Sequence, residues 1–256
     1  MSLADVAAAG RIRGFWPLNE AGGAARESFR GLTGADATGV GSAPGHIYPL
    51  SRSFVAANSD HFVVPSSGWL NMPSSGVMTF CGWAYQNSLA AAMALFARWG
   101  LPNSIVYNAQ FLNGTPLYRL LIGNALGDNT GAICPDADVI VTTGTWYFIR
   151  AEVDENIPRT RIQVNEVLGY STITNPGWSL VDSGDLWIGS DEATGNDFDG
   201  RLQAWALIEG TLTGPEITEI YNGGAGFDLN LYAPSAAQNT GYNYYYPFHR
   251  RDSWAA

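Results

Sequence analysis

The stretch with the most chemical potential is "EVDENI", from Glu152 to Ile157, where two carboxylates alternate within an apolar pattern. Side chains two positions apart on a β-strand point to the same face, so Glu152 and Asp154 would project from one side of a sheet. Two carboxylates on one face can divide acid and base roles when their environments separate their pKa values. The chain has 23 acidic residues, however, so a chance Glu-x-Asp pair is expected.

Other catalytic and ligand-binding patterns are weaker. His46, His61 and His249 fall in unrelated segments and lack the spacing of paired metal ligands. The glycine-rich "GGAGFD" follows a predicted helix, whereas a phosphate-binding loop precedes one. We therefore predict no catalytic residue, no metal site and no cofactor. The acid-rich loop "SDEATGNDFDG" leaves calcium open, but solvated acidic turns are common and we claim no ion there.

Composition narrows the class of protein and its partners. The chain has 256 residues with 30 Gly and 13 Pro, which favours one large domain with many turns. Its net charge of -10 argues against nucleic acid, because binding to phosphates draws on Lys and Arg. No apolar run is long enough to span a membrane, and the first residues lack the pattern of a secretory signal. We expect neither nucleic acid nor a membrane as a partner.

Short apolar alternations separated by Gly, Pro, Asn and Asp predict strands along most of the chain. The segment 144–167, "GTWYFIRAEVDENIPRTRIQVNEV", reads as a hairpin. One helix is well marked in "TLTGPEITEIYNGG", where Thr213 and Glu216 form a capping box, Pro215 suits the first turn and Gly223 ends the helix. The predicted class is all-β with one short C-terminal helix.

The two ends of the chain differ from its middle. We predict a short helix or arm over residues 1–12, a β domain over 13–228 and an aromatic-rich arm over 229–256. The last segment loses periodicity and then gathers Tyr242, Tyr244, Tyr245, Tyr246, Phe248 and Trp254. Disordered tails are poor in aromatic residues. We therefore expect these rings to bind either their own domain or another chain.

Five segments, in this order, resemble the landmarks of a known family. They are "GFWPLNEAGG", "SRSFVAANSDHFVVP", "MTFCGWAYQN", the hairpin over 144–167, and "LWIGSDEATGNDFDGRLQAWALIEGTLTGPEITEIYNGG". The order is similar to that of laminin-G-like domains in the concanavalin A-like lectin/glucanase superfamily, and the likeness runs from about Arg13 to Gly226. The resemblance implies a jelly roll of two antiparallel sheets packed face to face. The composition of the two chain ends adds extended terminal arms to this fold.

The resemblance also implies which side chains face the core. Two sets would pack between the sheets: Tyr147, Ile149, Ala151 and Val153 in one strand, and Leu202, Ala204 and Ala206 in another. The opposite faces would then carry a mixed aromatic and polar set: Trp83, Tyr85, Arg150, Glu152, Gln203 and Trp205. Aromatic rings can stack on a sugar while polar neighbours bind its hydroxyls, so this set is the candidate carbohydrate site. The alternative, that these side chains complete the packing of the sheet or lie under the terminal arms, stays open.

Enzymatic activity and calcium are both less favoured by the resemblance. Glucanases of this superfamily carry Glu-x-Asp-x-x-Glu along one strand, and the third acid is replaced here by Ile157. The position after Phe-x-Gly that is often acidic in relatives is Gln203 here. We therefore predict a protein that is not an enzyme.

Jelly rolls of this type resemble capsid decoration, head-spike and fibre modules of bacteriophages. The prediction is a non-enzymatic structural protein located in the virion and forming a homo-oligomer. Its arms would bind other virion proteins, such as the major capsid protein or copies of itself, and its jelly roll would bind a cell-surface glycan. A stand-alone carbohydrate-binding lectin is the main alternative, and a glycoside hydrolase is a further one.

Overall fold

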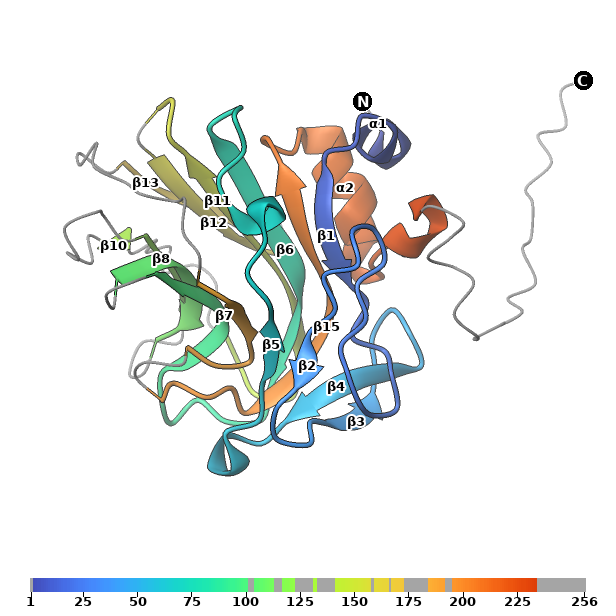
Figure 1. Cartoon of the computed structure of the whole chain (residues 1–256), viewed down its shortest axis with the longest axis vertical. Coiled ribbons are helices and arrows are strands. Elements are labelled where there is room, and N and C mark those ends of the chain that lie inside the picture. Colours follow the sequence, from blue (N-terminus) through green and yellow to red (C-terminus); the bar gives the residue numbers. More distant parts are fainter. Residues whose placement is uncertain are drawn as a thin grey trace, which may run out of the picture.

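Two antiparallel sheets face each other in a computed structural model that describes residues 2–100, 104–112, 117–122, 131–132, 141–157, 159–165, 167–172, 184–191 and 195–233 (Figure 1). The eight-stranded sheet runs in the order β13 (Val167–Thr172), β12 (Arg159–Val164), β11 (Trp146–Asp154), β6 (Val77–Gln86), β15 (Gly200–Glu209), β4 (Leu50–Phe54) and β3 (Gly41–Pro44), with β1 (Ile12–Trp16) also paired to β15. The seven-stranded sheet runs β10 (Gly131–Ala132), β9 (Tyr118–Ile122), β8 (Ser104–Phe111), β7 (Met93–Gly100), β14 (Leu186–Ile188), β5 (Phe62–Val64) and β2 (Ala35–Asp36). The predicted two-sheet jelly roll is confirmed.

The core lies between the two sheets. In β11 it takes the alternate residues that the sequence predicts: Tyr147, Ile149, Ala151 and Val153. Rings from β6, β7 and β8 meet them, with Phe80 stacked on Phe96 at 4.5 Å between centroids and close to Tyr107 at 4.6 Å. Burying each large apolar side chain contributes about 1.5–3 kcal/mol, and this layer holds the sandwich together.

The predicted alternation fails halfway along β15. Leu202 packs between the sheets as expected, but Ala204 and Ala206 face the other way and Trp205 enters the core. The reason is a bulge: Ala204 has a left-handed φ of 54°, and the pairing of β15 with β6 shifts between Gln203 and Ala206. One extra residue in a strand reverses the face of every residue after it.

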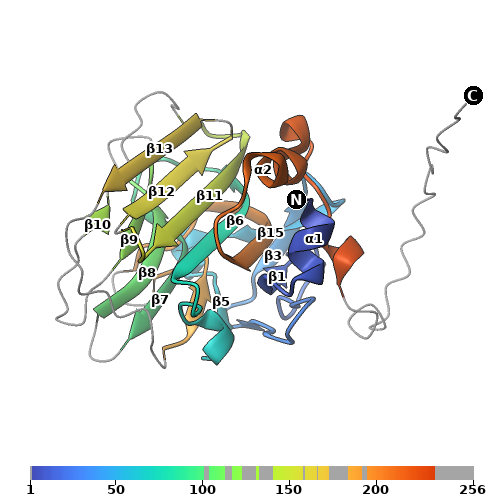
Figure 2. The ribbon, with the colours of Figure 1, turned by 90° about the horizontal axis from the view of Figure 1, so that it is seen from above.

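The outer face of the eight-stranded sheet is partly covered by elements from both ends of the chain. They are α1 (Leu3–Ala8), α2 (Gly214–Tyr221) and the 3₁₀ turns η3 (Asn222–Gly224) and η4 (Leu229–Tyr232). Figure 2 shows α1 and α2 on the side of this sheet that faces away from β7 and β8. Leu3 and Val6 of α1 and Leu229 of η4 are buried in a second apolar cluster there. Leu3 and Val6 of the predicted N-terminal arm and Leu229 of the predicted C-terminal arm thus pack on their own domain.

The predicted capping box at the start of α2 is present. Thr213 and Glu216 bond reciprocally, and Asn222 adopts the left-handed conformation that ends the helix. Two further 3₁₀ turns, η1 (Ala56–Asn58) and η2 (Gly68–Leu70), lie in the connections on either side of β5. None of the helices in the described residues combines the length and apolarity needed to cross a membrane.

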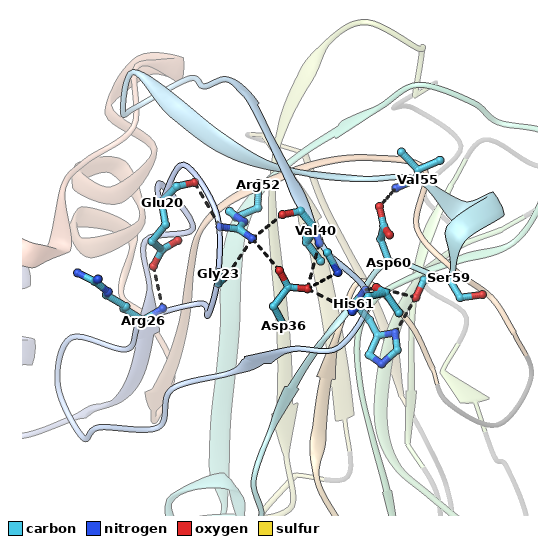
Figure 3. Close-up of polar contacts among 12 residues, drawn as sticks. Glu20, Gly23, Arg26, Asp36, Val40, Arg52, Val55, Ser59, Asp60 and His61 are labelled. Carbon is cyan, nitrogen blue, oxygen red and sulfur yellow. Dashed lines mark hydrogen bonds and ion pairs between the residues drawn. The ribbon is translucent and has the colours of Figure 1, made fainter.

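Arg52 fastens the long segment that precedes β3 against β4 (Figure 3). Its buried guanidinium donates to the carbonyl oxygens of Gly23 at 2.9 Å and Val40 at 2.6 Å, and it pairs with Asp36 at 3.5 Å. A buried guanidinium must be hydrogen-bonded to offset its desolvation. The contacts therefore hold the segment that precedes β3 against β4 at this edge of the sheet.

Candidate functional site

Of the six predicted sugar-binding residues, the structure leaves only Tyr85 partly exposed. Trp83, Arg150, Glu152, Gln203 and Trp205 are all buried. The expectation that the six form one exposed face is therefore wrong for five of them. Trp205 is inside the sandwich because of the bulge in β15, and its Nε1 donates to the carbonyl oxygen of Trp83 at 3.2 Å.

Trp83 and Gln203 are buried by two different neighbours. The ring of Trp83 stacks on Tyr221 of α2 at 6.0 Å and contacts His46 at 4.2 Å between centroids. Gln203 holds the turn over residues 45–49, because its Oε1 accepts from the backbone N–H groups of His46 and Ile47 at 2.9 and 2.7 Å. Its Nε2 donates to the carbonyl oxygens of Tyr48 and Leu50. The polar atoms of Gln203 are thereby used within the fold.

Glu152 and Arg150 form a buried charge cluster. Glu152 is fully buried, and its two carboxylate oxygens lie 3.3 Å from Arg161 Nη1 and 3.8 Å from Arg150 Nη1. Burial lowers the pKa of Arg150, while Glu152 acts in the opposite direction. Asp154 accepts hydrogen bonds from the turn that follows β11 and pairs with Arg159 at 3.2 Å. Both carboxylates of the Glu-x-Asp pair serve as structural partners here.

The uncovered end of the same sheet face carries three side chains that we name the aromatic row: Trp146, Tyr85 and Arg201. Trp146 of β11 is the cross-strand neighbour of Tyr85 in β6, which is the neighbour of Arg201 in β15. The centroids of the two rings are 5.5 Å apart, and the guanidinium carbon of Arg201 lies 4.4 Å from the Tyr85 centroid. All three side chains are partly exposed.

Polar groups border the aromatic row on one side. Asn87 and Asp199 lie one residue beyond the paired ends of β6 and β15, and Asn87 Nδ2 donates to Asp199 Oδ1 at 3.3 Å. Arg201 Nη1 donates to the carbonyl oxygen of Pro44 at 3.3 Å. Nε and Nη2 of Arg201 have no hydrogen-bond acceptor among the described residues. The border therefore offers both donors and acceptors to a ligand.

His46 borders the other side of the aromatic row. Its ring stacks on Trp146 at 5.8 Å, and its Nε2 must be the donor to the carbonyl oxygen of Gly224 at 2.6 Å. Burial lowers the pKa of His46, and the bond to Gly224 acts in the opposite direction. The His46 ring therefore favours its neutral form. Because it contacts both Trp83 and Trp146, it lies between the covered and uncovered parts of the sheet face.

The sequence contained a signal for the two residues of the row that the prediction missed. Trp146 has the same parity as Arg150 in the hairpin strand, and Arg201 has the same parity as Gln203 before the bulge.

The predicted arm residues Tyr242, Tyr244, Tyr245, Tyr246, Phe248 and Trp254 lie outside the described residues.

The carboxylates of the acid-rich loop that the structure describes each bond to a different partner. Asp191 accepts from Asn196 Nδ2 at 2.7 Å, Asp197 accepts from Ser190 Oγ at 2.7 Å, and Asp199 bonds to Asn87. Within the part of the chain that the structure describes, no group of three or more His, Cys, Asp or Glu side chains could hold a metal ion.

The sequence profile of the concanavalin A-like lectin/glucanases superfamily (Laminin_G_3) matches residues 56–218, which is more than half of the chain. The chain belongs to this superfamily. No curated protein sequence matches this concanavalin A-like chain.

Solved structures agree on the fold at low sequence identity. Domain 4 of AbnA, an arabinanase from Geobacillus stearothermophilus solved with arabinotriose, is 17% identical with a TM-score of 0.53, covering 70% of this chain and 79% of that one. The binding domain of Paraclostridial Mosquitocidal Protein 1 is 10% identical with a TM-score of 0.65, covering 87% and 53%. Trypanosoma rangeli sialidase is 14% identical with a TM-score of 0.58, covering 84% and 33%. The concanavalin A-like chain thus spans about half of the toxin domain's chain and a third of the sialidase.

Proposed function

We propose that this concanavalin A-like chain is a non-catalytic glycan-binding domain and that the aromatic row is its binding surface. One observation carries the proposal. Trp146, Tyr85 and Arg201 are consecutive cross-strand neighbours that stay partly exposed where the cover of the sheet ends. Aromatic and arginine side chains gathered in one exposed patch are typical of binding surfaces.

The chemistry of the row suits a sugar. The C–H groups on one side of a pyranose ring can pack on the indole of Trp146 and the edge of Tyr85. Hydroxyl groups need donors and acceptors near that apolar contact, and Arg201, Asn87 and Asp199 supply both kinds. Arg201 already rests on Tyr85, so its free donors are held in place before a ligand arrives.

Two further observations support binding without catalysis. Glu152 and Asp154 are engaged in ion pairs and, in the case of Asp154, with a turn, whereas a glycosidase needs two carboxylates that face the sugar bond. The similar structures include an arabinanase domain solved with arabinotriose and a toxin binding domain. Both likenesses favour a recognition domain on this fold.

A glycan array with purified wild-type protein and a Trp146→Ala variant tests the proposal. We expect the variant to bind at least tenfold more weakly, which corresponds to about 1.4 kcal/mol. Trp69→Ala is the matched control, because Trp69 is 41% exposed and also contacts two arginines, Arg13 and Arg30, away from the row. If the wild type binds no glycan on the array, the proposal is wrong.

We also propose that the domain works as an attachment module within a virion, joined to other structural proteins or to its own copies through residues 234–256. The support is compositional: this segment follows η4 and contains six closely spaced aromatic residues. A deletion of residues 234–256 should leave the fold intact, because it keeps the buried Leu229. We expect the deletion to abolish attachment to particles or self-association, measured by co-sedimentation and light scattering. Full attachment by the shortened chain would contradict this part of the proposal.

A further inference from the structure

The aromatic row continues in register across two more strands. Arg201 in β15 is the neighbour of Ser53 in β4, and Ser53 is the neighbour of Gly41 in β3. One line of cross-strand neighbours therefore crosses β11, β6, β15, β4 and β3. We name the five residues on this line, Trp146, Tyr85, Arg201, Ser53 and Gly41, the extended row.

The two ends of the extended row differ in height. Trp146 and Tyr85 place large rings at one end. At the other end, Ser53 has a small side chain and Gly41 has none. Ser53 is partly exposed and Gly41 is exposed. A Cβ at Gly41 would come no nearer to its surroundings than 3.7 Å, at the Ser53 carbonyl oxygen, which is ordinary contact. The small end of the row is therefore open.

The length of the extended row matches that of an oligosaccharide and exceeds that of a single sugar unit. Neighbouring strands lie about 4.8 Å apart, so five strands span about 19 Å. The advance per unit of an extended polysaccharide is similar to the spacing of strands. A glycan laid across the strands would thus meet a new strand with almost every unit.

We infer that the extended row binds the interior of an extended, neutral polysaccharide chain, with Trp146 and Tyr85 as the stacking end and Ser53 with Gly41 as an open floor over which the chain continues. This inference rests on the proposed function and adds the class of glycan to it. Arg201 is the one charge within the row, and Asp199 beside it carries the opposite sign. The balance of charge favours neutral sugars over acidic ones.

Isothermal titration calorimetry with oligosaccharides of increasing length tests this inference. The probes are cello-, xylo-, manno- and arabino-oligosaccharides of one to six units, with sialyllactose as a short acidic probe. We expect at least one neutral series to gain affinity with each unit up to about five, the number of strands crossed, and then to level off. A single sugar that binds as tightly as the hexamer would overturn the inference and leave the proposed function standing. Binding of sialyllactose alone would have the same meaning, and so would no binding to any of these probes by a protein that binds another glycan on the array.

A pair of serine variants tests the open end directly. Ser53→Gln raises a larger side chain from the floor, and we expect five-unit binding to weaken at least tenfold while two-unit binding stays unchanged. Ser42→Gln is the matched control, because Ser42 lies beside Gly41 on β3 with the opposite parity. Equal effects of the two variants, or no effect of Ser53→Gln on the five-unit ligand, would show that the chain does not cross β4. Melting temperatures of both variants establish that they fold.

Discussion

The covered and uncovered parts of one sheet face differ although the same three strands build both. In the covered part, Trp83 and Phe148 lie beneath Tyr221 of α2. In the uncovered part, Tyr85 and Trp146 form the next cross-strand pair on the same face, two residues away from Trp83 and Phe148, and remain partly exposed. Residue type is similar in the two parts. What differs is the presence of elements from the ends of the chain, so cover decides whether an aromatic pair joins the buried core or stays partly exposed, as the proposed binding surface requires.

The largest expected contrast is between two tryptophans. Trp83→Ala removes a buried ring that contacts His46, Phe148 and Tyr221, and we expect it to lower the free energy of unfolding by about 3–5 kcal/mol. Trp146→Ala should lower it by about 1 kcal/mol or less, since the ring is partly exposed. Urea unfolding followed by circular dichroism measures both values. Equal losses would mean that the two parts of the face are not distinct.

The buried charges of Glu152 and Arg150 should contribute to the stability of the fold. Glu152→Gln removes the partner of Arg161 and Arg150, and we expect a loss of about 3 kcal/mol because a buried guanidinium is left unpaired. Glu155→Gln on the turn after β11 is the control for the chemical change. A polysaccharide hydrolysis assay runs in parallel. Hydrolysis by the wild type that disappears in the folded Glu152 variant would contradict the non-catalytic proposal.

A smaller effect is expected at the point where the sheet accommodates its bulge. A Cβ on Gly82 would lie 2.4 Å from the ring of Trp205, so Gly82→Ala should cost about 1–3 kcal/mol through overpacking. Gly68→Ala is the control, because a Cβ there meets nothing within 4 Å. Thermal unfolding of the two variants separates them. A neutral Gly82→Ala would mean that Trp205 can leave its place at little cost.

The smallest effect concerns the histidine between the two parts. Burial lowers the pKa of His46, so the unfolded chain binds its proton more readily than the folded one. The free energy of unfolding should therefore be unaffected by this residue above about pH 6.5 and should decrease as the pH falls below that value. Unfolding at several pH values, with His46→Gln and the control His61→Gln, isolates the contribution. An unchanged slope in His46→Gln would contradict the assignment.

The sequence predicted what depends on local pattern. The alternation in β11 places Tyr147 and Ile149 between the sheets, and the capping box of Thr213 and Glu216 starts α2 where expected. Strands with one apolar face and a capping box act over a few residues, so they can be read directly from the chain.

The parts that could not be predicted depend on distant contacts. The bulge at Ala204 involves a left-handed alanine, which no residue preference signals, and it reversed the faces of Trp205 and Ala206. The burial of Trp83 and Gln203 depends on α2 and on the turn over 45–49, which come from other regions of the chain. An alternating pattern separates two faces of a strand but does not tell what lies on top of either.

Gln203 accepts hydrogen bonds from two backbone N–H groups with its oxygen, and its NH₂ group donates to the carbonyl oxygens of Tyr48 in the same turn and Leu50 at the start of β4. A carboxylate of the same shape would keep the first two contacts and set its second oxygen against both carbonyls. Only an amide can accept from the backbone N–H groups and donate to the backbone carbonyl oxygens at the same time. One uncharged side chain thereby anchors the β3–β4 hairpin to β15 and keeps neighbouring strands from sliding past each other.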